Sequence, residues 1–91
     1  MNDKVFQVDI LSPQSRVYSG TAVSLAAPGE LGSFGVLAGH APLLSKLVPG
    51  VILLKEPSGQ ILSFRSKAKG FLEVLKNEVR VLVDEAERIP A

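Results

Sequence analysis

Residues 70–84 read GFLEVLKNEVRVLVD and carry the clearest two-strand signal in the chain. Every second residue from Val79 to Val83 is a valine, and a hydrophobic period of two is typical of a strand with one buried face. Asn77 lies at the centre of a three-residue turn between the two runs and tolerates a left-handed backbone. We therefore predict a β-hairpin with strands at residues 70–75 and 79–84.

A second hairpin is predicted earlier in the chain, from residues 51–55 and 60–65. The segment between them, Glu56-Pro57-Ser58-Gly59, has a proline that presets φ and a glycine that accepts a positive φ. Residues 6–10 and 23–25 alternate between apolar and polar side chains in the same way. The same strand period therefore recurs along most of the chain.

Glycine and proline punctuate the sequence so often that few segments could form a helix of three turns. Short strands with turn signals every ~8–12 residues indicate an all-β fold, a flattened β-sandwich or barrel of about 8–10 short strands with no substantial helix. We predict a single domain over residues 1–91. Residues 84–91 would be a short tail, in which Asp84 and Arg88 could form one helical turn before Pro90.

Composition excludes several classes of protein. Ten Lys and Arg against nine Asp and Glu leave a net charge of +1, without the basic excess typical of nucleic-acid binding. The chain has no cysteine. It has no apolar run near the ~20 residues of a membrane helix, and residues 1–5 lack the apolar stretch of a signal peptide. We expect a soluble protein. Because 46% of its residues are hydrophobic, some should stay exposed, and a contiguous group would mark a protein partner.

No motif in the sequence predicts catalysis. His40 is the only histidine, so a multi-histidine metal site is not expected, and its constrained turn favours a hydrogen bond from the imidazole to a backbone carbonyl. The glycine-rich segment 28–35 lacks the following helix of a phosphate-binding loop. We interpret it as tight turns that hold the Glu30 carboxylate on a rigid projection. The sequence therefore predicts no catalytic, metal-binding or nucleotide-binding residue and no cofactor.

Two further patterns bear on partners. Arg65, Lys67 and Lys69 alternate with small residues and would place three cations on one strand face. Such a face is either a solvated, lysine-protected edge or a surface for an acidic partner or lipid headgroups. Leu43 and Leu44, if extended, point to opposite sides, so burying both requires a cover on each side. The second cover is either the sandwich core or another protein.

Several motifs follow one another along almost the whole chain, from about Phe6 to Ile89. They are VDILSP at 8–13, YSG at 18–20, PGELG at 28–32, GVLAGHAPLL at 35–44, PG at 49–50, GFLEV at 70–74 and VLVDEAE at 81–87. In this order and spacing they resemble the N-terminal β-sandwich domain of the epsilon subunit of the F-type ATP synthase. The combination of GHAPLL and GFLEV is the most specific part of the resemblance.

The resemblance implies a non-catalytic rotor subunit in the central stalk. Members of this family bind the gamma subunit, here expected 1:1, and rest on the polar loops of the c-ring, so that proton-driven rotation reaches gamma during ATP synthesis. Glu30 and Leu31 would face the c-ring loops. The gamma contact would be formed by His40, Ala41, Pro42, Leu43 and Leu44.

The resemblance also implies a location. The protein would be peripheral on the cytoplasmic face of a bacterial inner membrane, or on a photosynthetic or organelle equivalent, and would meet the membrane only through the complex. Longer family members carry a C-terminal helical hairpin that can inhibit ATP hydrolysis or bind ATP, and a chain ending at Ala91 is expected to do neither. Two alternatives remain open, a small β-sandwich module that binds a peptide or sugar and a small hydrolase centred on His40.

Overall fold

The computed structural model describes residues 4–90, and this part of the chain contains ten strands and no helix. The strands are β1 (Phe6–Leu11), β2 (Arg16–Ala22), β3 (Ser24–Gly29), β4 (Gly32–Leu37), β5 (Leu43–Leu47), β6 (Gly50–Lys55), β7 (Ile61–Ser66), β8 (Gly70–Leu75), β9 (Glu78–Val83) and β10 (Ala86–Ile89). The predicted all-β fold is confirmed. Accordingly, the described residues include no helix that is long and apolar enough to cross a membrane. Residues 1–3, where the sequence predicts no signal peptide, and Ala91 lie outside the described part.

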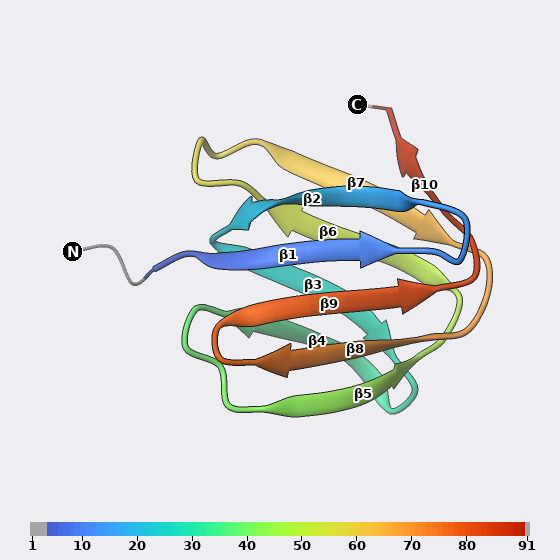
Figure 1. The fold of residues 1–91 in the computed structure, drawn as a ribbon, viewed down its shortest axis with the longest axis horizontal. Helices are drawn as coiled ribbons and strands as arrows, with labels where there is room; N and C mark the ends of the chain where they lie inside the picture. The colour runs from blue at the N-terminus through green and yellow to red at the C-terminus, as the bar shows by residue number, and fades with distance from the viewer. Residues whose placement is uncertain (1–3, 91) are drawn as a thin grey trace.

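The strands form one hydrogen-bonded sheet that folds over on itself into two layers. Its order is β10-β7-β6-β3-β5-β8-β9-β1-β2, and β4 pairs with β3 beside this path. In Figure 1, β1, β9 and β8 cross in front of β6, β3 and β4. The two ends of the order, β10 and β2, come close to each other. The result is the flattened, nearly closed sandwich that the sequence predicts, with extents of 37 × 28 × 23 Å.

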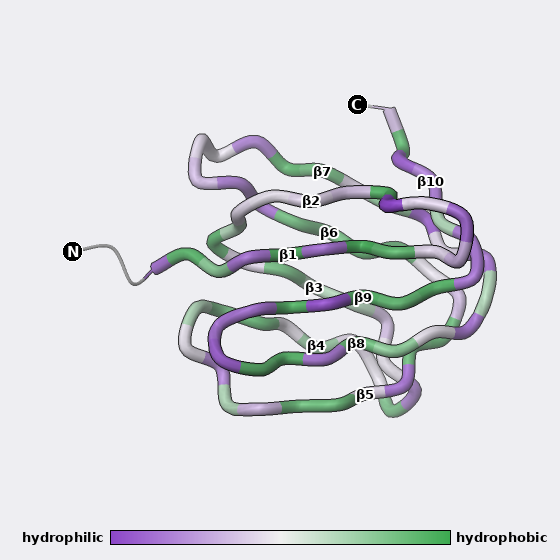
Figure 2. The backbone as a smooth tube through the Cα atoms, viewed as in Figure 1, coloured by the Kyte–Doolittle hydropathy of each residue, from purple (hydrophilic) through white to green (hydrophobic). Residues whose placement is uncertain are grey.

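The core lies between the layers and is built from the alternation visible in the sequence. β1 buries Phe6, Val8 and Ile10, while the residues between them are half-buried. Figure 2 shows this alternation of hydrophobic and hydrophilic residues along β1. Phe64 and Ile52 lie opposite each other on β7 and β6 and are almost completely buried. Each large side chain of this kind contributes about 1.5–3 kcal/mol by leaving water, so the core is the main source of stability.

Both predicted hairpins form, with one correction to a turn. Gly59 has φ 95°, as the predicted turn between β6 and β7 requires. Between β8 and β9 the turn has two residues, Lys76 and Asn77, with φ 52° and 62°. Glu78, which we expected in the turn, pairs with Leu75 as the first residue of β9. Two consecutive positive φ angles are those of a type I′ turn, whose twist matches that of the flanking strands.

The predicted C-terminal helical turn does not form. Residues Ala86–Ile89 are instead the extended strand β10, which pairs antiparallel with β7. Spacing of charges favours a helical turn only weakly, by ~0.2–0.5 kcal/mol per pair, whereas pairing along β7 satisfies the backbone groups of both strands. The tertiary partner therefore decides the conformation of this segment.

The expectation of three cations on one strand face is also wrong. Arg65 lies on β7, but the strand ends at Ser66, and Lys67 and Lys69 lie in the connection to β8. The Ser66 hydroxyl donates a hydrogen bond to the Ala68 carbonyl at 2.9 Å, which helps to turn the chain there. Lys67 Nζ lies 3.7 Å from Glu87 Oε1 of β10, in an exposed ion pair.

Candidate functional site

Glu30 and Leu31 form the tip of the β3–β4 hairpin. Gly29 and Gly32 pair with each other directly below the tip, and the Glu30 N–H donates to the Lys46 carbonyl at 3.0 Å. The tip is therefore tied to β5 through its backbone, while the Leu31 side chain is fully exposed. This is the rigid projecting carboxylate that the sequence predicts, and it carries a large apolar side chain beside it.

His40 lies in the connection between β4 and β5. Its N–H donates to the Leu37 carbonyl at 3.1 Å, and its Nδ1 is 2.7 Å from the Ala41 carbonyl oxygen. Because a carbonyl oxygen only accepts, Nδ1 carries the hydrogen of this bond, and the predicted bond from the imidazole to the backbone is confirmed. Among the described residues no group of three His, Cys, Asp or Glu is placed to hold a metal ion.

Asn77 fixes the position of this connection, a role that sequence reasoning missed. Its Oδ1 accepts from the Gly39 N–H at 2.8 Å, and its Nδ2 donates to the Val5 carbonyl at 2.8 Å. The Gln7 N–H reaches the Asn77 carbonyl at 3.3 Å. One side chain thus ties the His40 turn to the start of β1. The sequence indicates that Asn77 tolerates a left-handed turn. The neighbouring residues do not indicate which segments its side chain contacts.

Leu43 and Leu44, at the start of β5, point to opposite sides as predicted. Leu43 packs against the core, while Leu44 remains 70% exposed and lies opposite Glu73 of β8. The strands β4 and β5 separate the Glu30 tip from the His40 turn, so the two predicted contact regions lie at opposite ends of the domain (Figure 1).

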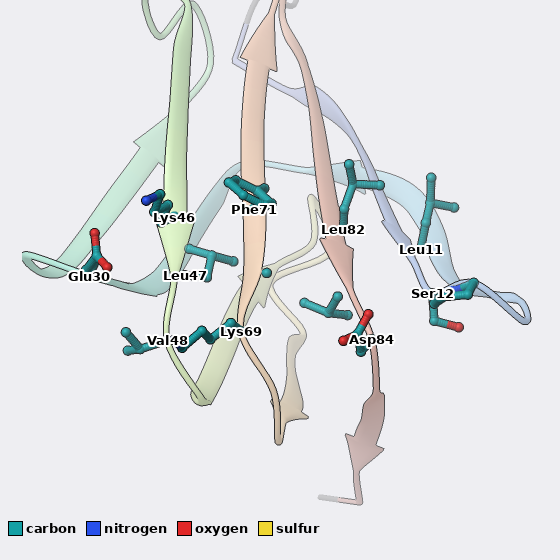
Figure 3. Close-up of a pocket in the computed structure, with 13 residues that line it drawn as sticks. Leu11, Ser12, Glu30, Lys46, Leu47, Val48, Lys69, Phe71, Leu82 and Asp84 are labelled. Carbon is teal, nitrogen blue, oxygen red and sulfur yellow. The ribbon is translucent and has the colours of Figure 1, made fainter.

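A groove at the end of the sandwich where β5 and β9 end and β8 begins adjoins the Glu30 tip. It has a volume of about 790 Å³, and Leu47, Phe71 and Leu82 lie in its middle, with Glu30 and Asp84 on opposite sides (Figure 3). Phe71 pairs with Leu82, and Leu82 pairs with Leu11 of β1, so an apolar row crosses three strands. The lysines that line the groove are Lys46 and Lys69.

A second hollow of about 510 Å³ lies on the outer face of β3, β4 and β6. Small residues line it together with larger apolar residues and a lysine. The residues on this face that line it are Ser24, Ala26, Gly35, Leu37, Leu53, Lys55 and Ile61. Leu37, Leu53 and Ile61 are exposed. The surplus of exposed apolar surface that the composition predicts is therefore present, and much of it gathers here.

Tyr18 of β2 links the two layers of the sandwich through its hydroxyl and its ring. Its hydroxyl donates to Glu56 Oε2 at 2.9 Å, and its ring lies 5.5 Å from that of Phe64, tilted by 56°. Burial raises the pKa of Tyr18 from its ordinary value of 10.0 to about 12, with the hydrogen bond to Glu56 as the second cause. The bond holds β2 against the β6–β7 turn.

This raised pKa predicts an alkaline loss of stability. The native state favours the neutral phenol, so its contribution is complete below pH 10 and is lost as pH rises toward about 12. We expect the advantage in unfolding free energy of the native chain over Tyr18→Phe to shrink across this range. Urea denaturation of both proteins from pH 9 to 12 measures it, and an advantage that stays constant would contradict the assignment.

The chain is similar to subunits of ATP synthases. The family model of the ATP synthase delta/epsilon chain β-sandwich domain matches residues 5–89. The ATP synthase epsilon chain of Nitrosococcus oceani is 42% identical over 81 residues, which are 89% of this chain and 57% of that protein. This chain therefore spans little more than half the length of that curated relative.

Two solved structures share the fold. One is a chain of the cryo-EM structure of the Euglena gracilis mitochondrial ATP synthase, OSCP/F1/c-ring, with TM-score 0.87 and 20% identity over 93% of this chain and 54% of that one. The other is a chain of the central stalk/c-ring structure of the Tetrahymena thermophila mitochondrial ATP synthase. Its TM-score is 0.69, at 19% identity over 88% of this chain and 63% of that chain.

Proposed function

The chain belongs to the family of ATP synthase delta/epsilon chain β-sandwich domains, and from this membership we propose that it is a non-catalytic rotor part of an F-type ATP synthase. In this role it couples the gamma subunit to the c-ring during proton-driven ATP synthesis. The observation that carries the proposal is the match of the family model to 5–89, supported by a rigid sandwich with exposed contact regions at two opposite ends.

The two ends take different partners in this proposal. Glu30 and Leu31 contact the polar loops of the c-ring, because a fixed carboxylate beside an exposed leucine offers both a charge and an apolar contact on a tip held by backbone hydrogen bonds. A tip that bent under load would not transmit rotation. Its attachment to β5 supports this role.

The gamma subunit contacts the other end, at His40, Ala41, Pro42, Leu43 and Leu44, and binds 1:1. Leu44 is the anchor, since its exposed side chain gains most from burial. A stable interface should exceed ~1,000 Å², with apolar residues at its centre and charged residues at its rim.

The proposal also sets the location and the chemistry. The chain acts as a peripheral protein on the cytoplasmic face of a bacterial inner membrane, or a photosynthetic or organelle equivalent, and reaches the membrane only through the complex. It needs no cofactor and no bound nucleotide, because its task is mechanical.

Leu44→Asp is expected to weaken binding to purified gamma at least tenfold, whereas Glu30→Ala leaves it within about twofold. Burying an unpaired carboxylate at an interface centre is costly, while Glu30 lies at the far end. Leu82→Asp, at another exposed leucine, is the control and should bind normally. Titration calorimetry measures all three, and equal affinity of the two main variants would contradict the assignment of ends.

A further inference from the structure

The strand β4 has an unpaired edge. Among the described residues it pairs with β3 alone, whereas β3 is also bonded on its other side to β6 and β5. Pro28 lies opposite Ser33, has no N–H, and directs its carbonyl to the Val48 N–H on the far side of β3. In an antiparallel ladder hydrogen-bonded and non-bonded pairs alternate. Ser33 and Gly35 therefore direct their backbone groups away from β3, toward solvent, whereas the Leu37 carbonyl already accepts the His40 N–H.

This edge lacks the usual protection against pairing. Edge strands are normally blunted by charged residues, proline or short length. β4 reads GSFGVL over six residues, without a charge or a proline. The two ends of the strand order differ, because β10 has four residues, with Glu87 and Arg88 among them and Pro90 after it, and β2 is held by the hydrogen bond from Tyr18.

The open edge also borders the smaller apolar hollow. Gly35 and Leu37 line this hollow together with Ala26 of β3 and Leu53 of β6. A strand placed along β4 would thus gain backbone hydrogen bonds at its edge, and apolar side chains beside that strand could cover the hollow. An open backbone edge calls for an extended partner segment, and a hollow whose lining is mostly apolar, with Lys55 as its charged residue, calls for mainly apolar side chains.

We propose that β4 is a docking edge on which the gamma subunit adds an extended, largely apolar strand by backbone pairing at Ser33 and Gly35. The inference rests on the proposed function, which supplies gamma as the partner. β4 ends at Leu37 and runs directly into the His40 turn, so the edge and the proposed gamma contact are continuous along the chain. The partner therefore extends the sheet, in addition to covering Leu44.

Gly35→Pro tests the pairing, with Gly35→Ala as a matched control. A Cβ at Gly35 meets no atom closer than 3.7 Å, so an alanine side chain fits and a proline Cβ meets no clash. Proline removes an N–H that faces solvent in the free chain, and an edge strand tolerates this. We expect Gly35→Pro to lose at least tenfold in affinity for purified gamma and Gly35→Ala to bind as the native chain does. Equal affinity of the two variants would overturn the inference.

Amide hydrogen exchange provides a readout that does not depend on a variant. In the free chain the amides of Ser33 and Gly35 should exchange quickly, and those of Phe34 and Val36 slowly. Gamma should slow Ser33 and Gly35 at least tenfold. A 1:1 complex in which these amides still exchange quickly would overturn strand addition while leaving the proposed function intact.

Two other results would distinguish a failure of the proposed function from a failure of this inference. Failure of the native chain to bind gamma at all would overturn the proposed function, and with it the identity of the strand donor. A dimer of the free chain in sedimentation, dispersed by Gly35→Pro but not by Gly35→Ala, would mean that a second copy occupies the edge, and would overturn gamma as its occupant.

Discussion

Phe64→Ala is expected to lower the free energy of unfolding by about 3–5 kcal/mol, the usual cost of removing a buried phenylalanine. Phe64 is 1% exposed, lies on β7 between β6 and β10, and packs its ring against that of Tyr18. Its loss leaves a cavity where two layers and a hydrogen-bonded tyrosine meet. For a domain of 91 residues, whose total stability is ~5–14 kcal/mol, this is a large fraction.

Phe71→Ala is the matched control for this prediction. The same substitution on β8 removes a ring that is 45% exposed, on the outer face of the sheet, where no closed cavity results. We expect a cost of about 1 kcal/mol or less. Denaturant unfolding followed by far-ultraviolet circular dichroism measures both. A similar cost for the two variants would show that the assignment of inner and outer faces is wrong.

Asn77→Ala is expected to cost about 2–3 kcal/mol in unfolding free energy. Part of the cost is conformational, because alanine at φ 62° pays ~1 kcal/mol or more that asparagine largely avoids. The rest comes from two side-chain hydrogen bonds, to Gly39 and Val5, each worth ~0.5–1.5 kcal/mol.

Asn77→Gly separates the two causes. Glycine accepts the left-handed backbone but makes neither side-chain bond, so it should cost about 1–2 kcal/mol. In both variants the amide hydrogen of Gly39 should exchange faster with solvent, because its acceptor, Asn77 Oδ1, is gone. If Asn77→Gly were as stable as the native chain, the connection before β5 would not depend on Asn77, and the proposed gamma contact would need another support.

The fold class and the two hairpins could be predicted because their signals are local. Alternation along residues 79–83 fixes which side chains can share a buried face, and Gly59 or Asn77 can adopt backbones that other residues avoid. The exposed Glu30 tip was also predictable, since glycines and a proline around it leave a tight turn as the favoured structure. These properties depend on neighbours within a few residues.

The failed prediction of a C-terminal helical turn required a distant partner. Charges at Asp84 and Arg88 are compatible with a helical turn until β7 offers its edge, 20 to 26 residues earlier in the chain. The role of Asn77 and the open edge of β4 belong to the same group, since neither can be recognised before the strands are placed beside one another.

The sequence by itself determined that this chain is a β-sandwich with tight turns, an exposed carboxylate tip and more apolar surface than its core can hide, because side-chain periodicity and turn chemistry act over a few residues. Only the tertiary structure decided which strand edges are satisfied and which remain open. Backbone hydrogen bonding between strands is nearly independent of side-chain identity, so the sequence of β4 does not reveal that one of its edges has no partner in the described chain.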